Sequence, residues 1–213
     1  SIFCIFDSNS ANIMKAIITG DVINSREIDS EIWIKELHNL FKTIGKEPKD
    51  WQIYRGDSFQ LIVDANKALE FAILIKATLK TIKPLDARIA IGIGEIEYES
   101  EQITESNGSA FIYSGEQFNE LKKTTLAIRT ADERINQELK TVIDLVTFIM
   151  HNWTEKMAEY FKIAFLNQHL NQKQLAKLLE LKSQSTVSSI LKRAAYEEII
   201  QSIVYYQIKL HEL

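Results

Sequence analysis

The chain has 213 residues, a formal net charge of −4 and a hydrophobic share of 46%. This balance is typical of a folded globular protein and excludes both a disordered chain and a strongly basic one. The single cysteine excludes an internal disulfide framework and favours a reducing compartment, so we expect a cytoplasmic protein. No apolar stretch is long enough to span a membrane, and we interpret residues 1–13 as an upstream extension or a cloning remnant before Met14.

Apolar periodicity predicts a β-α-β-β-α-β order in the first part of the chain. In chain order we expect a strand at 15–19, a helix at 30–44, hairpin arms at 51–55 and 58–63, a helix at 66–80, a strand at 87–94, a short helix at 115–122 and a strand at 124–129. This order predicts an α+β fold with helices on one face of an antiparallel-containing sheet, a ferredoxin-like or palm arrangement.

The strand predicted at 87–94 alternates between isoleucines on one face and a nearly bare second face. The second face carries Arg88, Ala90, Gly92 and Gly94. A face without large side chains lets a ligand, a packed helix or a partner approach the backbone.

The glycines predict how the chain divides into domains. All seven lie between Gly20 and Gly115, so we expect the rest to be mostly helical. We predict a palm domain at 14–130, a connecting helix at 131–150 that begins at a capping box, and a helix-turn-helix domain at 151–213. One side of the connecting helix carries an apolar stripe, which fits either a core or a dimer seam. Its residues are Ile135, Leu139, Val142, Ile143, Val146, Ile149 and Met150. We expect the protein to be a homodimer.

Two aspartates, Asp21 and Asp57, each follow a glycine at the end of a short apolar run. Two carboxylates that converge from neighbouring strand ends can hold Mg²⁺ or Mn²⁺ against a polyphosphate. Two ordinary Gly-Asp turns are the alternative explanation, because aspartate favours turns.

A polar turn follows Asp21, and its backbone N–H groups suit a phosphate. Arginines near both aspartates can pair with phosphate oxygens or serve as solvated surface residues. The candidate nucleotide-binding residues are Gly20, Ile23, Asn24, Ser25, Arg26, Arg55 and Gly56.

These segments together resemble the motif series of the SatD family. The series comprises 20–26 (GDVINSR), 56–60 (GDSFQ), 88–96 (RIAIGIGEI) and 108–111 (GSAF). More distantly they are similar to the palm of class III nucleotidyl cyclases, GGDEF-type cyclases and minimal CRISPR polymerases. The resemblance implies that the first-strand and hairpin carboxylates, here Asp21 and Asp57, bind two metal ions and a nucleoside triphosphate.

The chain departs from the cyclase pattern at residues that serve catalysis. The transition-state asparagine and arginine have no match in 113–121, Ile53 stands near the place of the base-selecting lysine, and Ser58 replaces the glutamate of GDEF. We therefore expect nucleotide and metal binding. An active nucleotidyl cyclase or transferase, and a structural interaction protein with a vestigial pocket, are the alternatives.

The segment 172–193 resembles a helix-turn-helix, with Ala176 at the helix crossing, Leu181 in the turn, and Val187 facing inward. Residues 151–213 carry a net charge of +2 and the rest carries −6. We expect regulatory binding of duplex DNA, and a helical dimerisation bundle is the alternative. The candidate DNA-binding residues are Gln184, Ser185, Thr186, Ser188, Lys192 and Arg193.

Overall fold

The computed structural model describes residues 14–122, 124–181 and 183–213, so the extension expected at 1–13 lies outside the described residues. Its strands are β1 (Lys15–Ile23), β2 (Trp51–Tyr54), β3 (Ser58–Asp64), β4 (Asp86–Gly94) and β5 (Leu126–Arg129). Its helices are α1 (Ser30–Phe41), α2 (Ala65–Lys80), α3 (Ser109–Glu120), α4 (Glu133–His151), α5 (Glu155–Leu166), α6 (Gln172–Leu178), α7 (Gln184–Arg193) and α8 (Tyr196–Leu210). Two 3₁₀ turns, η2 (Ser25–Glu27) and η3 (Ile103–Glu105), lie in loops.

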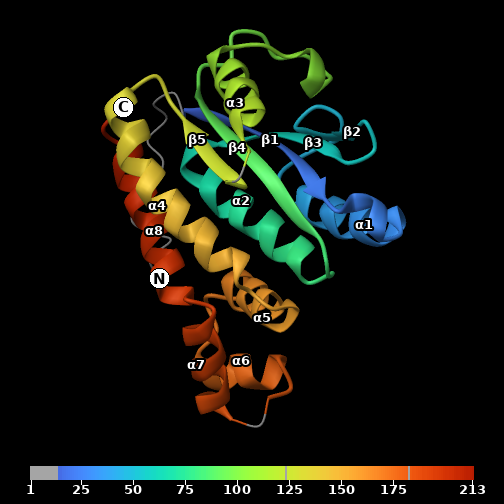
Figure 1. Cartoon of the computed structure of the whole chain (residues 1–213), viewed down its shortest axis with the longest axis vertical. Helices are drawn as coiled ribbons and strands as arrows, with labels where there is room; N and C mark the ends of the chain where they lie inside the picture. Colours follow the sequence, from blue (N-terminus) through green and yellow to red (C-terminus); the bar gives the residue numbers. More distant parts are fainter. Residues whose placement is uncertain (1–13, 123, 182) are drawn as a thin grey trace.

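The five strands form one mixed sheet in the order β2-β3-β1-β4-β5 (Figure 1). The central strand β1 is antiparallel to both β3 and β4, whereas β5 is parallel to β4. The predicted β-α-β-β-α-β order and the α+β class are confirmed. Strand β1 runs to Ile23 rather than ending at residue 19, because Val22 continues its buried alternation.

Helices cover both faces of the sheet, so the prediction of helices on one face is wrong (Figure 1). Helices α1 and α2 pack against the isoleucine-rich face, where Phe41 meets Phe59 at 5.6 Å between ring centroids. Helix α3 lies on the other face. A Cβ at Gly92 would stand 2.2 Å from the Ala110 carbonyl oxygen, so the bare face of β4 serves close helix packing.

The apolar stripe of α4 belongs to the core. Ile135, Leu139, Ile143, Val146 and Met150 are buried in the same cluster as the sheet, so this stripe is not a dimer seam. The exposed apolar residues of α4 are instead Leu145 and Phe148.

The C-terminal helices divide between two clusters rather than forming one separate domain. Helices α5 and α8 pack in the main core, with Phe161 and Tyr206 fully buried, and the Tyr206 hydroxyl donates to the Ala65 carbonyl oxygen at 2.7 Å. Helices α6 and α7 enclose a small second cluster around Leu175, Ala176 and Val187. The division expected at residue 151 therefore does not coincide with a division of the core.

Two helix starts differ from the sequence prediction. Helix α3 begins at Ser109 instead of 115, because the chain reverses at Gly108 with a φ of 151° that suits glycine. Helix α4 begins at Glu133 rather than at 131, because the Asp132 carboxylate caps it by accepting from the backbone N–H groups of Arg134 and Ile135.

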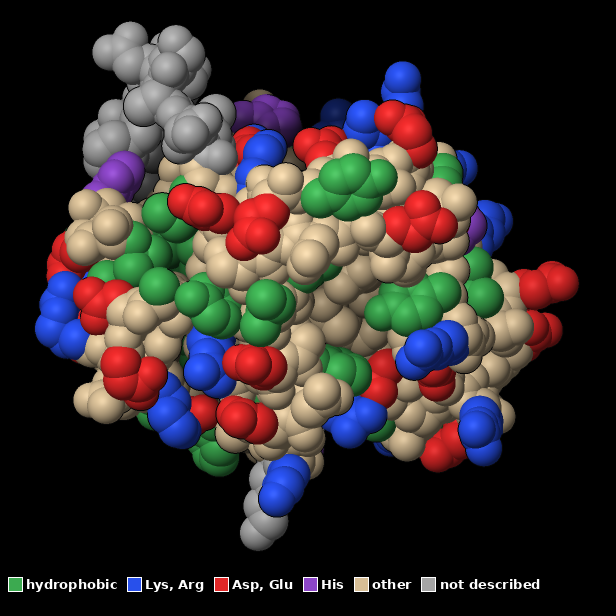
Figure 2. Space-filling model, turned by 90° about the horizontal axis from the view of Figure 1, so that it is seen from above, with side chains coloured by type: hydrophobic (Ala, Val, Ile, Leu, Met, Phe, Trp, Pro, Cys, Tyr) green, Lys and Arg blue, Asp and Glu red, His purple; other side chains and the backbone are tan. Residues whose placement is uncertain are grey.

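The surface seen from above carries interspersed acidic and basic side chains, and its hydrophobic side chains form separated patches (Figure 2). Among the described helices, none combines the length and the apolar character needed to cross a membrane.

Candidate functional site

Asp21 lies within β1 and not at its end. Its backbone pairs with Ser58 of β3 on one side and with Arg88 of β4 on the other. Ala16, Ile18 and Val22 alternate into the main core, which directs the Asp21 side chain to the opposite face of the sheet, beside α3.

Arg88 holds the Asp21 carboxylate with two donors. Its Nε donates to Asp21 Oδ1 at 3.0 Å, and one Nη donates to Oδ2. The hydrogen bond to Asp21 raises the pKa of Arg88, and the charge of Asp57 raises it further. The guanidinium also lies over the Phe118 ring, 5.6 Å from its centroid. Arg88 is therefore the hydrogen-bonded ion-pair partner of Asp21, and Asp57 acts on it only through its charge.

Asp57 comes from the β2–β3 hairpin, whose turn residues Arg55 and Gly56 have φ values of 52° and 91°. Positive φ at both positions is typical of the turns that join tight hairpins. The Asp57 carbonyl oxygen accepts from Val22 N at 3.1 Å, and its Oδ2 accepts from the Ser25 hydroxyl at 2.7 Å. The hairpin thus places Asp57 next to the segment that carries Asp21.

The other candidate nucleotide-binding residues take several positions. Asn24 adopts a left-handed conformation and donates to the Pro84 carbonyl oxygen at 3.0 Å, which orients the turn after β1. Arg26 is exposed, and Arg55 is exposed with its guanidinium 6.0 Å from the Tyr54 ring. A Cβ at Gly20 would meet the Phe59 ring at 2.4 Å, so packing requires this glycine. Ile23 ends β1 directly before the turn.

A line of hydroxyl and amide groups extends the polar face from Asp21 toward α3. Gln60 Nε2 donates to Thr19 Oγ1 at 3.3 Å, and Thr19 Oγ1 lies 3.1 Å from the Oγ of the buried Ser114. Sequence reasoning missed Arg88, Thr19 and Ser114 as site residues. Arg88 could have been found from its alternation, because it shares the bare face of its strand with Gly92 and Gly94.

The oxygen atoms of this site are the kind of ligand that a hard divalent cation prefers. Mg²⁺ is commonly bound by one or two carboxylates together with substrate phosphates, and Asp21, Asp57 and the Ser25 hydroxyl supply oxygen atoms. No group of three His, Cys, Asp or Glu side chains suited to a metal occurs in the part of the chain that the structure describes. A cation bound by Asp21 would have to displace Arg88 from its carboxylate.

The model of the SatD family matches residues 15–202. The chain belongs to the SatD family. The match extends from β1 into α8 and so includes the two aspartates, α6 and α7. No curated protein matches the chain.

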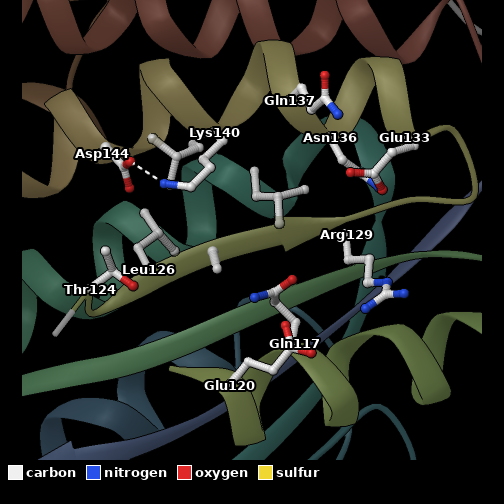
Figure 3. A pocket seen from close by; sticks show the side chains of 13 residues that line it. Gln117, Glu120, Thr124, Leu126, Arg129, Glu133, Asn136, Gln137, Lys140 and Asp144 are labelled. Atoms are coloured by element: carbon white, nitrogen blue, oxygen red, sulfur yellow. Dashed lines mark hydrogen bonds and ion pairs between the residues drawn. The ribbon is translucent and has the colours of Figure 1, made fainter. Parts of the chain in front are cut away.

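A separate groove of about 310 Å³ lies between α3, the free edge of β5 and α4 (Figure 3). None of the sequence-predicted site residues lines it. Its polar rim includes Gln117 and Glu120 from α3, Arg129 from β5, and Glu133 and Lys140 from α4. This groove is distinct from the face that carries Asp21.

Helices α6 and α7 of this SatD-family protein contain the residues for which the sequence predicts a helix-turn-helix. Asn171 and Gln174 form a capping box at α6, and the Ser183 hydroxyl accepts from Thr186 N at 3.3 Å at the start of α7. Val187 is buried, and the candidate DNA-binding residues Gln184, Ser185, Ser188, Lys192 and Arg193 are exposed, with Thr186 half-buried.

Proposed function

We propose that this protein binds a nucleotide together with Mg²⁺ or Mn²⁺ at Asp21 and Asp57, and that this binding is coupled to regulatory DNA binding by α6 and α7. One observation carries the proposal. Asp21 on the central strand and Asp57 in the neighbouring hairpin come from segments joined by the hydrogen bond from Val22 N to the Asp57 carbonyl oxygen at 3.1 Å. One or two such carboxylates, together with substrate phosphates, are the usual ligands of Mg²⁺ in proteins.

Each residue has a defined part in this proposal. Asp21 and Asp57 hold the metal, and Arg88 leaves Asp21 to pair with a phosphate oxygen. Ser25 orients Asp57 through their 2.7 Å hydrogen bond. A bound metal ion would neutralise phosphate charge. Ile23, Asn24, Arg26, Arg55 and Gly56 complete the proposed nucleotide surface, whereas Gly20 is buried against Phe59.

The sheet order supports a palm-like identity for this domain. Strands β2-β3-β1-β4 form an antiparallel set with β1 at its centre, as expected for a ferredoxin-like arrangement. Nucleotide binding is favoured over cyclase or transferase activity, because the transition-state pair of cyclases has no counterpart in 113–121.

Titration with ATP and GTP, with and without Mn²⁺, tests the proposal directly. We expect Mn²⁺-dependent binding that is lost in Asp21→Asn and in Asp57→Asn. Asp64→Asn is the matched control, because Asp64 ends β3 and pairs with Lys15 at 2.7 Å away from the site. Wild-type affinity in both site variants would refute the site, and a cyclic or oligomeric product would favour the enzymatic alternative.

The exposed residues of α7 support DNA binding as the coupled activity. Lys192 and Arg193 lie in its last turn, and Gln184 lies at its start, where its amide donates to Gln172 at 3.2 Å. Replacing Lys192 and Arg193 together with alanine should weaken binding to all sequences and reduce the salt slope by up to about two units. Gln184→Ala should instead change the preference among sequences. A protein without salt-sensitive DNA binding would make α6 and α7 a packing module.

A further inference from the structure

Helices α6 and α7 are joined at their first residues by a hydrogen bond between two side-chain amides. Gln172 opens α6 and Gln184 opens α7. Gln184 Nε2 donates to Gln172 Oε1 at 3.2 Å, and both residues are exposed. This bond decides which hydrogen-bonding groups of Gln184 remain available to a ligand.

The hydroxyl groups next to Gln184 make contacts within the chain. The Oγ of Ser183, which caps α7, lies 2.8 Å from Ser185 Oγ and 3.0 Å from Thr186 Oγ1. Val187 is buried. Gln184 is therefore the residue in the first turn of α7 best suited to read a base edge, because an amide can pair with a base through two hydrogen bonds at once.

An amide that reads a base must match the donors and acceptors on the edge of that base. In the major groove adenine presents an acceptor, N7, beside a donor, the N6 amino group, whereas guanine presents two acceptors, N7 and O6. A glutamine amide has one acceptor oxygen and two N–H donors. Because Gln184 uses one N–H on Gln172, it keeps one N–H and its Oε1, and this pattern complements adenine.

The direction of the bond between the two amides distinguishes the two purines. If Gln172 donated to Gln184 Oε1 instead, Gln184 would present its two N–H donors, which match the two acceptors of guanine. The acceptor that Gln172 offers is therefore the feature that favours adenine.

We propose that Gln184 reads adenine in the major groove of duplex DNA, and that Gln172 is the positioning residue that makes it select adenine over guanine. This inference rests on the proposed DNA binding by α6 and α7, and it names the base that this surface recognises. A capping box holds the start of α6, where Asn171 N donates to Gln174 Oε1 at 2.9 Å and Asn171 Oδ1 accepts from Gln174 N at 3.0 Å. The backbone of Gln172 is thereby fixed beside α7.

Selection from a randomised duplex library, with and without ATP and Mn²⁺, tests the inference. The base position whose preference disappears in Gln184→Ala is the position that Gln184 reads. We expect adenine there in the wild type, bound about tenfold more tightly than guanine, as expected for one bidentate pair. Two duplexes that differ only at this position then give the ratio of affinities for each variant.

Two variants of Gln172 separate positioning from charge. Gln172→Glu keeps an acceptor and should retain the adenine preference. Gln172→Lys offers only donors, so it should reverse the Gln184 amide and shift the ratio toward guanine by about tenfold or more. Both charges also act on the phosphates of every duplex, and the ratio of affinities removes this effect.

Gln168→Glu and Gln168→Lys are the matched controls, because Gln168 is exposed in the turn between α5 and α6. These controls should leave the ratio unchanged. A ratio that is the same in the wild type and in both Gln172 variants, or guanine at the position that Gln184 reads, would overturn the inference and leave DNA binding intact. A protein that binds no duplex in a salt-sensitive manner would refute the proposed DNA binding, and this inference with it.

Discussion

Arg88 and Asp21 face each other across adjacent antiparallel strands, and both donors of the guanidinium edge engage the carboxylate. This pair occupies the oxygen atoms that a metal ion would need. Arg88→Gln should therefore tighten Mn²⁺ binding in the absence of nucleotide by about tenfold, because it releases a carboxylate beside Asp57. Nucleotide affinity should fall in the same variant, since the phosphate loses its cation.

Stability should change little in Arg88→Gln, by about 1 kcal/mol or less, because the Arg88 side chain is 40% exposed and water screens the pair. Mn²⁺ titration by electron paramagnetic resonance measures the first effect, and urea unfolding measures the second. Unchanged Mn²⁺ affinity would show that Arg88 does not compete for the site.

Gly92 and Gly115 make a matched pair of substitutions at the contact between α3 and the sheet. A Cβ at Gly92 would stand 2.2 Å from the Ala110 carbonyl oxygen and 2.3 Å from Ser114 N, whereas a Cβ at Gly115 meets nothing within 4 Å. Gly92→Ala should cost about 1–3 kcal/mol by forcing α3 outward. Gly115→Ala should stabilise the helix by about 1 kcal/mol. Urea unfolding gives both values, and equal effects would contradict the packing described.

Glu70 should make the free energy of unfolding depend on pH near neutrality. Burial raises the pKa of Glu70 from 4.5 to about 7, against the opposing effects of Lys67 and of the Gln207 amide that donates to it at 3.2 Å. The folded protein therefore holds a proton on Glu70 that the unfolded chain releases above pH 4.5. Stability from this group is complete below pH 4.5 and is lost as pH rises to about 7.

Glu70→Gln remains neutral and should remove this dependence. The stability of the variant relative to wild type should rise by up to about 3 kcal/mol between pH 4.5 and 7, and then level off. Chemical unfolding at a series of pH values provides the measurement. A difference that stays constant across this range would mean that Glu70 titrates normally.

Lys76 and Asp86 form an ion pair inside the core. Lys76, 1% exposed, donates to Asp86 Oδ1 at 2.7 Å and to the Ala87 carbonyl oxygen at 2.7 Å, and burial lowers its pKa. Asp86→Ala should cost about 3–5 kcal/mol, because it leaves a buried cation without its partner. Lys76→Met should cost less, since Asp86 keeps Lys80 at 3.4 Å. The double variant should be more stable than Asp86→Ala alone, and strict additivity in urea unfolding would contradict this coupling.

The sequence predicted the element order because alternation and helical periodicity are local properties. The isoleucines of β4 pointed to the core as expected, and the bare face of the same strand did mark a close approach. Nothing local could decide whether α3 or a ligand would fill that face. The same limit explains why Arg88 was missed as a site residue. Its contact with Asp21 follows from the register of β1 against β4, which relates residues 67 positions apart.

The domain division at residue 151 illustrates a second limit. The turn signals and capping residues around α6 and α7 were visible in the sequence. The return of α8 to the main core was not visible, because its apolar positions fit a small helical bundle equally well. Contacts between α8 and α2, such as the hydrogen bond from Tyr206 to Ala65, distinguish the two arrangements.

The return of α8 changes how α6 and α7 are attached to the rest of the molecule. Trp153, just before α5, donates from Nε1 to the carbonyl oxygen of Ala194, at the junction of α7 and α8, at 3.0 Å. Ala194, where the chain leaves the helical pair, is therefore fixed to the start of α5, and the pair is not a tail on a flexible tether. We expect a truncation at residue 150 to unfold the sheet, because it removes the core side chains of α5 and α8, whereas excising 171–193 removes none of the main core.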